Sequence, residues 1–456
     1  MQTLLTHRQH ARAVLRLGGP LIGGHLAAFS IHITDTVMLG WYSVEALAAV
    51  VLGGSFYFIF FIVGAGFGFA VMPVVASAAA SGQHTQVRRV TRMAMWLSAL
   101  FCLLAIPVYL SSKPLLIGMG QDPEIAGLAA QYLRIAGWGL IPALQVVVLR
   151  SYFSALERVS VVFWITVISA VLNGLLNYAL IFGNWGAPEL GVQGAAIASV
   201  ILQTVSLVSL GVYAVLKTPE HALFQRWWRP DWEAFRSNYA LGWPIGLTSL
   251  AESGLFSATA IMMGWIGTIP LAAHGIALQL VGLSFMVQVG LSNVATIRAA
   301  QDFGRKDTVG LRRGALAVIG ISTGLALLAM VLYLAVPGLL LGLFLSPDDP
   351  ARPAVLLAGI GLLTVAALFQ VADAGQVVVL GLLRGIQDTK IPMIFAAVSY
   401  WLVGMPLSYI LGITYGFGGP GIWMGLVVGL SLAWVTMSVR FWRRAVPGAN
   451  LSQQTP

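Results

Sequence analysis

Three carboxylates fall within long apolar stretches of this 456-residue chain: Asp35, Glu252 and Asp373. The chain has only sixteen Asp and Glu residues, and most of the others lie in polar segments between the apolar stretches. Placing an ionised side chain at the centre of a bilayer costs at least roughly 2.5–3.5 kcal/mol. Acidic residues at such depth usually face a bundle interior or a wet cavity, where they mark the path of an ion or a substrate. These three residues are therefore the first candidates for functional chemistry.

The composition places the chain in a membrane. It is 58% hydrophobic and 9% charged, whereas soluble domains carry about 25% charged residues. The net charge of +9 does not indicate a nucleic-acid partner, because the basic residues recur between apolar stretches and form no single patch. The single cysteine, Cys102, excludes an internal disulfide framework and a cysteine metal cluster.

Twelve apolar stretches are long enough to cross the hydrocarbon as helices, which takes about 20 residues each. None shows the alternating pattern of a barrel strand, so we expect an all-α membrane protein. The expected spans cover residues 13–35, 46–72, 91–112, 128–150, 160–183, 192–216, 239–262, 270–296, 314–340, 353–380, 392–413 and 420–440.

The basic residues predict the orientation of these spans. With a cytoplasmic N-terminus, 22 of the 25 Lys and Arg residues fall on the cytoplasmic side. Lys113 and Arg352 fall outside, and Arg134 lies within a span. Such an excess follows the positive-inside rule and predicts that both termini are cytoplasmic.

The chain also contains an internal repeat. Residues 17–49 align with residues 241–273 at a shift of 224, with eleven identities in 33 positions. We expect an N-lobe of six spans (1–216), a cytoplasmic linker (217–238), a C-lobe of six spans (239–446) and a polar tail (447–456). Because each lobe has an even number of spans, the lobes should be related by a pseudo-twofold axis along the membrane normal.

Paired repeats of this kind are typical of secondary transporters, whose substrate sites usually lie where the repeats meet. The chain has no nucleotide-binding Walker motif, and no soluble segment is long enough to hydrolyse nucleotide. Transport would therefore be driven by an ion gradient.

Several short motifs, in order along both halves, give the chain a resemblance to the multidrug and toxic compound extrusion (MATE) family. The matching stretches are Pro20 with Thr34–Gly40, Gly66–Gly68 running through Pro73 to Gly82, Ala272–Gly275, Val289–Ser292 leading to Gly304–Asp307, and Leu383–Thr389 with Pro392. The resemblance covers nearly the whole chain and is strongest to the NorM-like branch, in which a Glu in span seven and an Asp in span ten match Glu252 and Asp373.

The resemblance implies a function and a set of site residues. It implies export of small organic cations, such as drugs and dyes, from the cytoplasm in exchange for Na⁺ or H⁺, with no cofactor. It further implies a bacterial-type inner-membrane location, and we expect a monomer. Asp35 matches the family's span-one Asp, and Asn173 and Asn177 match polar positions in span five that help to form a cation site in some members. In some members the second position is an Asp, whereas this chain has the amide Asn177 there.

Glu252 and Asp373 lie at comparable depth. Glu252 is about 21 Å of helix beyond Asn238, and Asp373 is about 16 Å before Arg384, if both helices rise 1.5 Å per residue. Two carboxylates in a low-dielectric lobe cannot both ionise cheaply, so the pair should hold a proton or a cation. The alternative is a structural role, in which each buried carboxyl accepts hydrogen bonds from a neighbouring helix.

Asp35 lies about 28 Å along its helix from Arg16 and should be nearer the outer side. Asn173 and Asn177 are spaced i, i+4, so both can point at one partner; they form either a second ion or substrate site with Asp35 or interhelical hydrogen bonds. Gln279 and Gln288 are further candidates for lining a C-lobe cavity. His25 and His32 share a helix face with Asp35, but no second helix clearly supplies metal ligands, so we expect no metal beyond Na⁺.

Other classes of function fit the sequence less well. A flippase for a lipid-linked or amphiphilic substrate could use the same fold, but it would need cationic patches in its cavity. A membrane-embedded enzyme would need a nucleophile or a metal constellation at one depth, and the sequence offers neither. A channel is disfavoured by the two-lobed repeat. The choice between Na⁺ and H⁺ stays open, because carboxylates serve both.

Overall fold

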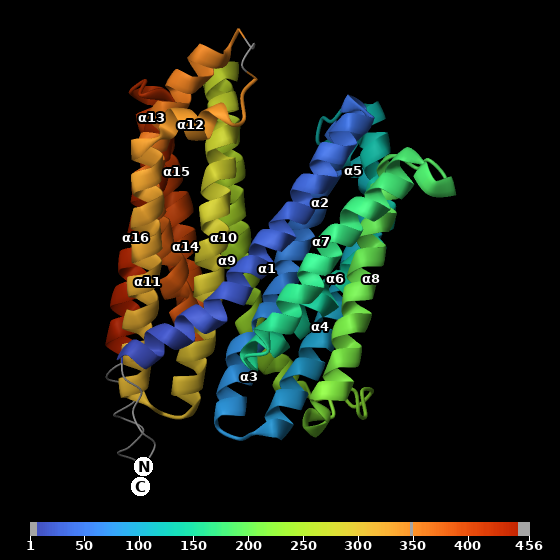
Figure 1. The fold of residues 1–456 in the computed structure, drawn as a ribbon, viewed down its shortest axis with the longest axis vertical. Helices are drawn as coiled ribbons and strands as arrows, with labels where there is room; N and C mark the ends of the chain where they lie inside the picture. The colour runs from blue at the N-terminus through green and yellow to red at the C-terminus, as the bar shows by residue number, and fades with distance from the viewer. Residues whose placement is uncertain (1–6, 347–349, 446–456) are drawn as a thin grey trace. The chain divides into compact units, whose positions relative to one another are not determined.

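The computed structural model describes residues 7–346 and 350–445, and these are almost entirely helical (Figure 1). Within this part of the chain, twelve helices are long and apolar enough to cross a membrane. This confirms the expected all-α architecture and the number of spans. The polar tail expected at 447–456 lies outside the described residues.

In the first half of the chain, the described residues form eight α-helices and two short 3₁₀ helices. They are α1 (His7–Tyr42), α2 (Val44–Phe69), α3 (Val71–Ala80), α4 (His84–Leu110), α5 (Ser112–Gly118), α6 (Pro123–Ala155), α7 (Val159–Phe182), η1 (Asn184–Gly186), α8 (Val192–Lys217) and η2 (Pro219–His221).

In the second half, residues 232–346 and 350–445 form eight α-helices and two π-helical segments. They are α9 (Trp232–Ile266), α10 (Thr268–Gly304), α11 (Thr308–Ala335), α12 (Pro337–Gly342), α13 (Arg352–Gly385), α14 (Lys390–Ala397), η3 (Val398–Gly404), α15 (Met405–Tyr409), η4 (Ile410–Thr414) and α16 (Gly418–Ala445). The run from α14 to η4 makes the eleventh span, in which both π-helical segments lie.

Local sequence explains where several helices begin and end. The Asp122 carboxylate caps α6 by accepting hydrogen bonds from the backbone N–H groups of Glu124 and Ile125, at 2.9 and 3.2 Å. Asp307 caps α11 through the Gly310 N–H at 2.8 Å. The span expected at 314–340 is divided: α11 ends at Ala335, and α12 begins at Pro337. Proline cannot donate the backbone hydrogen bond that would continue a helix.

By their packing, the described residues divide into two compact units. Unit 1 contains residues of Met1–Ile22 and Leu247–Pro456, and unit 2 contains Gly23–Gly246. The chain therefore crosses between the units inside α1 and inside α9. The lobe boundaries expected at 216 and 239 stay predictions. The two crossing points, after Ile22 and after Gly246, are separated by 224 residues, the shift of the internal repeat.

Glycines allow matching close helix contacts in both units. In unit 1, a Cβ on Gly290 of α10 would lie 2.6 Å from the Ile22 side chain of α1. In unit 2, a Cβ on Gly66 of α2 would lie 2.5 Å from the backbone N of Gly246 in α9. Gly66 and Gly290 are equivalent in the repeat, as are Ile22 and Gly246. The first half of each repeat's first helix therefore packs against the helices of the other repeat.

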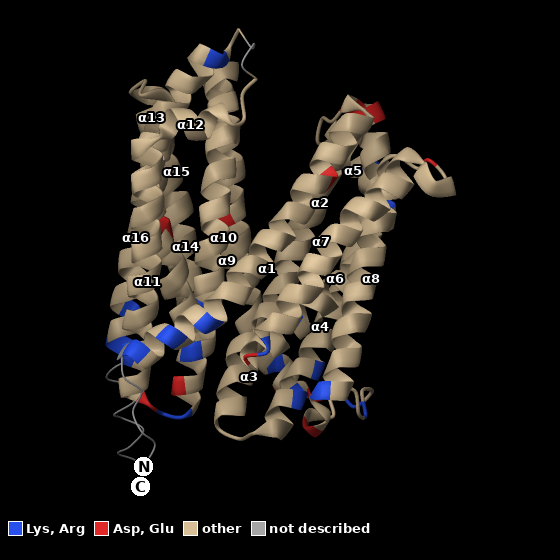
Figure 2. Ribbon diagram, in the orientation of Figure 1, with Lys and Arg blue, Asp and Glu red and all other residues tan. Residues whose placement is uncertain are grey.

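Each unit has a central buried helix. In unit 1, α13 packs against α10, α11 and α16; in unit 2, α6 packs against α2, α4 and α8. Within each unit, Lys and Arg gather toward one end of the helices, the end that carries the α3–α4 turn in unit 2 and the α10–α11 turn in unit 1 (Figure 2).

Candidate ion and substrate sites

In unit 2, Asp35 of α1 meets both asparagines of α7. The Nδ2 groups of Asn173 and Asn177 donate hydrogen bonds to Asp35 Oδ1 at 2.7 and 2.6 Å. Both asparagines are fully buried, whereas Asp35 is half-buried. The i, i+4 spacing places the two amides on one helix face, one turn apart.

The cluster also contains oxygens of the kind that could bind a hard cation. The two amide oxygens, Asn173 Oδ1 and Asn177 Oδ1, are buried and have no hydrogen-bond partner in the described part of the chain. Carboxylate and amide oxygens are the atoms that hard cations prefer as ligands. The arrangement can therefore hold Asp35 ionised through two donors and still offer oxygens to a cation.

In unit 1, Glu252 of α9 and Asp373 of α13 lie on helices that touch: Phe256, one turn after Glu252, contacts Phe369, one turn before Asp373, with ring centroids 6.0 Å apart. Asp373 is fully buried. Both oxygens of Asp373 and Glu252 Oε1 are buried without a hydrogen-bond partner among the described residues. A buried carboxylate without donors is unstable in the ionised form unless a cation or a proton joins it. Among the described residues, no neighbouring helix donates a hydrogen bond to these three oxygens.

Three further polar side chains near this pair were not singled out from the sequence: Gln376, Arg384 and Tyr400. Both polar atoms of Gln376, the Arg384 Nε and the Tyr400 hydroxyl are buried and have no partner in the described ranges. Arg384 lies three turns after Asp373 on α13. Trp401, the residue after Tyr400, donates a hydrogen bond to the carbonyl of Ala251, the neighbour of Glu252, at 3.2 Å.

Two of these side chains could have been found by spacing. Gln376 and Arg384 follow Asp373 by three and eleven residues, so all three share one broad face of α13. Tyr400 had no such signal, because it sits on the π-helical segment η3, which has no sequence pattern of its own. Short π-helical stretches occur frequently at functional sites.

A hydrogen-bonded network continues this polar interior of unit 1. The hydroxyl of Tyr333 donates to the Leu280 carbonyl at 2.9 Å, lies 2.8 Å from the Ser284 hydroxyl and accepts from Gln370 Nε2 at 3.3 Å. Gln370 is fully buried one turn before Asp373 on α13. Polar groups therefore run along α13 on both sides of Asp373.

The other expected polar residues lie apart from these clusters. Gln288 is buried, and its Oε1 accepts from the Ser322 hydroxyl at 2.6 Å, which links α10 to α11. Gln279 is exposed. Their role as cavity-lining residues stays a prediction. His274 Nδ1 accepts from Trp423 Nε1 at 3.0 Å. In the described residues, no three His, Cys, Asp or Glu side chains are grouped as metal ligands.

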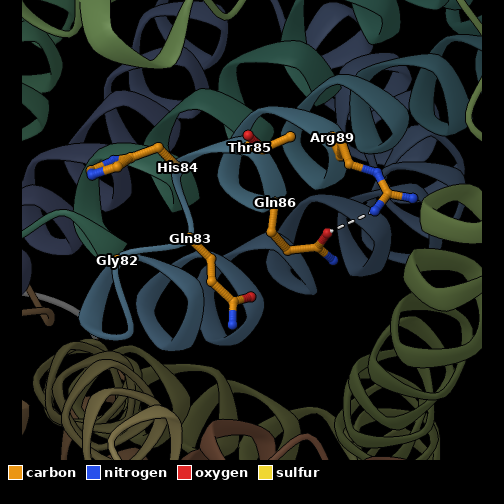
Figure 3. A pocket seen from close by; sticks show the side chains of 6 residues that line it. All are labelled: Gly82, Gln83, His84, Thr85, Gln86 and Arg89. Carbon is orange, nitrogen blue, oxygen red and sulfur yellow. Dashed lines mark hydrogen bonds between the residues drawn. The ribbon is translucent and has the colours of Figure 1, made fainter.

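A surface pocket of about 430 Å³ lies at the α3–α4 turn of unit 2. It is lined by Gly82, Gln83, His84, Thr85, Gln86 and Arg89, and Arg89 donates to Gln86 Oε1 at 3.3 Å (Figure 3). A single segment lines it, and that segment includes no carboxylate. We do not assign this pocket to ion or substrate binding.

The same region anchors the segment that leads into α9. Arg89 forms ion pairs with Asp231 and with Glu233, the latter at 2.7 Å. The hydrogen bond from Arg89 lowers the pKa of Asp231, while partial burial opposes that shift. Arg92 donates to the carbonyl of Arg226 at 3.0 Å. These contacts hold the linker against α4.

A second group of contacts holds the start of the linker. The hydroxyl of Tyr152 lies 2.6 Å from His221 Nδ1, and His84 Nδ1 lies 3.2 Å from His221 Nε2. Burial is the main cause of the lowered pKa of His221. We call these contacts, with the Arg89 ion pairs, the linker clasp.

A known family matches both halves of the chain. The family model MatE covers residues 20–179 and 244–410, which is more than half of the chain.

This chain belongs to the MatE family.

The two matched segments begin at Pro20 and Pro244, which are equivalent in the internal repeat.

Curated relatives of this MatE protein extend along nearly its whole length. A protein of Agrobacterium fabrum named "Probable multidrug resistance protein NorM" is 44% identical over 434 residues, covering 95% of this chain and 93% of the relative. A protein of the same name from Rhizobium meliloti is 42% identical, with the same coverage of both chains. The predicted resemblance to the NorM-like branch is confirmed.

Solved structures share the fold of this MatE protein. A MOP superfamily transporter from Pyrococcus furiosus matches with a TM-score of 0.86 at 19% identity, covering 96% of each chain. The eukaryotic MATE transporter AtDTX14 matches with a TM-score of 0.86 at 18% identity, covering 97% of this chain and 98% of that one. At these identities, the likeness shows the fold alone. Together with the family membership, it identifies the chain as a multi-pass membrane transporter and not an enzyme.

Proposed function

We propose that this protein is a secondary-active multidrug exporter. It moves small organic cations out of the cytoplasm in exchange for Na⁺ or H⁺, by alternating access and as a monomer in the bacterial inner membrane. Family membership and the name of the relatives from Agrobacterium fabrum and Rhizobium meliloti support multidrug transport. The exchange for Na⁺ or H⁺ and the choice of organic cations as substrates are proposed here as well.

The observation that carries the proposal is the pair Glu252 and Asp373. Three of their four oxygens are buried with no hydrogen-bond partner in the described residues. A proton or a monovalent cation would remove the cost of burying these charges. The same groups are therefore stable in the ion-loaded form and costly in the empty, ionised form.

This difference is what couples an ion to a conformational change. A ligand shifts an equilibrium between two states only by its difference in affinity for them. The empty pair favours the state in which water reaches the carboxylates, and the loaded pair favours the state in which they are buried. Loading from one side and release to the other would then drive the alternation of access.

Asp35, with Asn173 and Asn177, is the proposed second site. Its oxygens suit a cation, either the coupling ion or the positive group of a substrate. The two lobes do not share one site, since Asp35 is equivalent to Thr259 in the repeat and Glu252 is equivalent to Ala28. We assign ion coupling to the unit 1 pair, because its carboxylates have the fewer hydrogen-bond donors.

The proposed orientation has both termini in the cytoplasm. It rests on the gathering of Lys and Arg at one end of the helices in each unit (Figure 2). The test uses Gln83→Cys in a Cys102→Ala background, since Gln83 is exposed on the α3–α4 turn. A membrane-impermeant thiol reagent should label this variant only after the cells are opened; labelling of intact cells would contradict the orientation.

The coupling role is tested by efflux from proteoliposomes. Glu252→Gln and Asp373→Asn should each abolish efflux driven by a Na⁺ or pH gradient, at equal amounts of reconstituted protein. Glu45→Gln is a matched control, because Glu45 is exposed in the first turn of α2. Normal gradient-driven efflux in both site variants would refute the role of the pair. Applying a pure Na⁺ gradient and a pure pH gradient separately identifies the ion.

A further inference from the structure

The linker carries two arginines on either side of two tryptophans: Arg226, Trp227, Trp228 and Arg229, all within unit 2. The backbone N–H of Arg229 donates to the carbonyl of Arg226 at 3.1 Å, which closes a tight turn. The Cα atoms at the two ends of such a turn lie within about 7 Å of each other. The two arginines are therefore close enough to bind one ligand together. We call these four residues the Arg-Trp turn.

Contacts with α4 place the Arg-Trp turn at the edge of the apolar part of that helix. Trp96 Nε1 donates to the carbonyl of Trp227 at 3.1 Å, and one turn earlier Arg92 donates to the carbonyl of Arg226 at 3.0 Å. After Trp96, α4 continues to Leu110 without a charged residue. The turn therefore lies where the charged end of α4 meets its apolar stretch, which is the level of the lipid headgroups in a bilayer.

The side chains of the Arg-Trp turn are open to a ligand. Trp228 is 72% exposed, and both arginines of the turn are exposed. Neither arginine forms an ion pair among the described residues. The acidic residues that follow, Asp231 and Glu233, are already paired with Arg89. The turn therefore presents two positive charges that the protein itself does not neutralise.

We propose that the Arg-Trp turn binds the headgroup of an anionic phospholipid. Guanidinium groups bind phosphate oxygens through paired hydrogen bonds, and an indole ring prefers the boundary between headgroups and acyl chains. The two arginines bind the phosphate, and Trp228 lies against the lipid below it. Two unneutralised positive charges favour a lipid of net negative charge over a zwitterionic lipid with the same phosphate. None of these residues belongs to the ion and substrate sites, so the inference stands apart from the proposed function.

Trp228 itself reports which lipid lies beside it. The full-length protein is reconstituted in bilayers that mix phosphatidylglycerol and phosphatidylcholine, with one of the two lipids brominated on its acyl chains, because bromine quenches indole fluorescence on contact. The difference in emission between the wild type and Trp228→Phe isolates the signal of Trp228. Each arginine near an anionic lipid surface contributes roughly fivefold in affinity. Phosphatidylglycerol should therefore be preferred at Trp228 by about fivefold to thirtyfold.

Charge variants test whether the turn causes this preference, each compared with the same variant carrying Trp228→Phe. Arg226→Gln combined with Arg229→Gln should bring the ratio of the two lipid affinities close to one. The corresponding pair of Lys substitutions keeps both charges and should keep most of the preference. The matched control is Lys113→Gln with Arg134→Gln, which removes the same charge from two exposed residues of unit 2 outside the turn. This control should keep the wild-type ratio.

Several results would overturn the inference. Equal quenching of Trp228 by both brominated lipids in the wild type would do so, even if no variant folds. A double Gln variant that keeps the wild-type ratio would assign the preference to other residues. A Trp228 signal that neither lipid quenches would mean that something else covers the turn. If the wild type is then a dimer in native mass spectra and Trp228→Ser is a monomer, the occupant is a second copy of this chain.

Discussion

At the scale of single residues, the hydroxyl of Tyr400 is the sharpest probe of the unit 1 site. The side chain is fully buried, its hydroxyl has no partner in the described chain, and the next residue, Trp401, donates to the carbonyl of Ala251, which adjoins Glu252. A hydroxyl oxygen can bind a cation or accept and donate a proton. Tyr400→Phe removes this one atom and keeps the ring that fills the space.

We expect Tyr400→Phe to weaken ion coupling without unfolding the protein. A hydrogen bond to a charged group contributes about 1.5–3 kcal/mol, so the ion concentration at half-maximal efflux should rise roughly ten- to a hundredfold. Tyr415→Phe is the control, because Tyr415 is 68% exposed. An unchanged half-maximal concentration in Tyr400→Phe would exclude its hydroxyl from the site.

The asparagines around Asp35 give a second prediction at this scale. Asn173→Ala and Asn177→Ala each remove one donor from Asp35 Oδ1. Because Asp35 is half-buried and water can replace part of the loss, we expect each change to destabilise the protein by about 1–2 kcal/mol. Thermal unfolding in detergent measures this loss. Because both amides donate to one oxygen, the double variant should deviate from additivity; strictly additive effects would argue against a shared partner.

The residues also show what a sequence can and cannot predict. The i, i+4 spacing of Asn173 and Asn177 predicted that both could meet Asp35, and the structure places both amides on its Oδ1. The positive-inside rule assigned Arg384 to the cytoplasmic side as one more basic residue. It could not reveal that the Nε of this arginine is buried without a partner among the described residues, since burial depends on helices that are far apart in the chain.

At the scale of elements, the linker clasp should respond to pH. The pKa of His221 is lowered mainly by burial; His84 and Arg158 lower it further, and Glu220 raises it. A histidine with a lowered pKa favours the folded state in its neutral form. The stabilisation from this histidine is complete above about pH 6.5, its pKa in the unfolded chain. It is lost as the pH falls through the lower pKa that the histidine has in the folded protein. The Tyr152 hydroxyl faces the same ring but does not titrate in this range.

We therefore expect the linker to loosen on acidification. Between pH 7.5 and 5.5, hydrogen exchange at residues 219–230, corrected for intrinsic rates, should lose a few-fold of protection, since a buried hydrogen bond contributes about 0.5–1.5 kcal/mol. His221→Gln has no titrating ring and should remove this pH dependence. If it keeps the wild-type pH dependence, the histidine is not the responsible group.

The Arg89 ion pairs should hold the other end of the linker over this range. The pKa of Asp231 is lowered mainly by the hydrogen bond from Arg89, so its contribution is lost only as the pH falls below about 4. Loosening at pH 5.5 should therefore begin near His221 and spare the residues around Asp231.

The positions of whole helices were predictable because each span is marked by a long run of apolar residues in the sequence. Twenty apolar residues with charged flanks mark a span regardless of tertiary contacts. The helix ends were less predictable: α1 and α10 extend well beyond the expected spans, to 36 and 37 residues, since a helix need not stop where the hydrocarbon does. The π-helical segments η3 and η4 pack against α16, and no sequence pattern predicted them.

At the scale of the whole molecule, the repeat predicts more than a shared fold. The chain passes between its two units twice, after Ile22 and after Gly246, and these points are equivalent in the repeat. A proline precedes each crossing by two residues: Pro20 in α1 and Pro244 in α9. The sequence revealed the two prolines as equivalent but not that the units divide beside them, since packing across the whole chain decides that division.

Each proline weakens its helix next to the crossing. Proline lacks a backbone N–H, so the carbonyl four residues earlier loses its helical partner, and the helix can bend there at little cost. If the two units move as bodies during alternating access, α1 and α9 must bend at these two points, because both helices continue through them. The prolines would then serve transport at the expense of stability.

We expect Pro20→Ala and Pro244→Ala to stabilise the protein and slow transport. Restoring the missing hydrogen bond should raise the free energy of unfolding by up to about 3 kcal/mol for each helix, while the rate of efflux of a fluorescent organic cation such as ethidium from proteoliposomes falls. Pro142→Ala is the matched control, because Pro142 lies inside α6, within unit 2 and away from either crossing. This control variant should stabilise the protein without slowing efflux. Equal slowing by all three variants would show that proline content matters only for folding, whereas slowing confined to Pro20 and Pro244 would make the two crossings the hinges of the transport cycle.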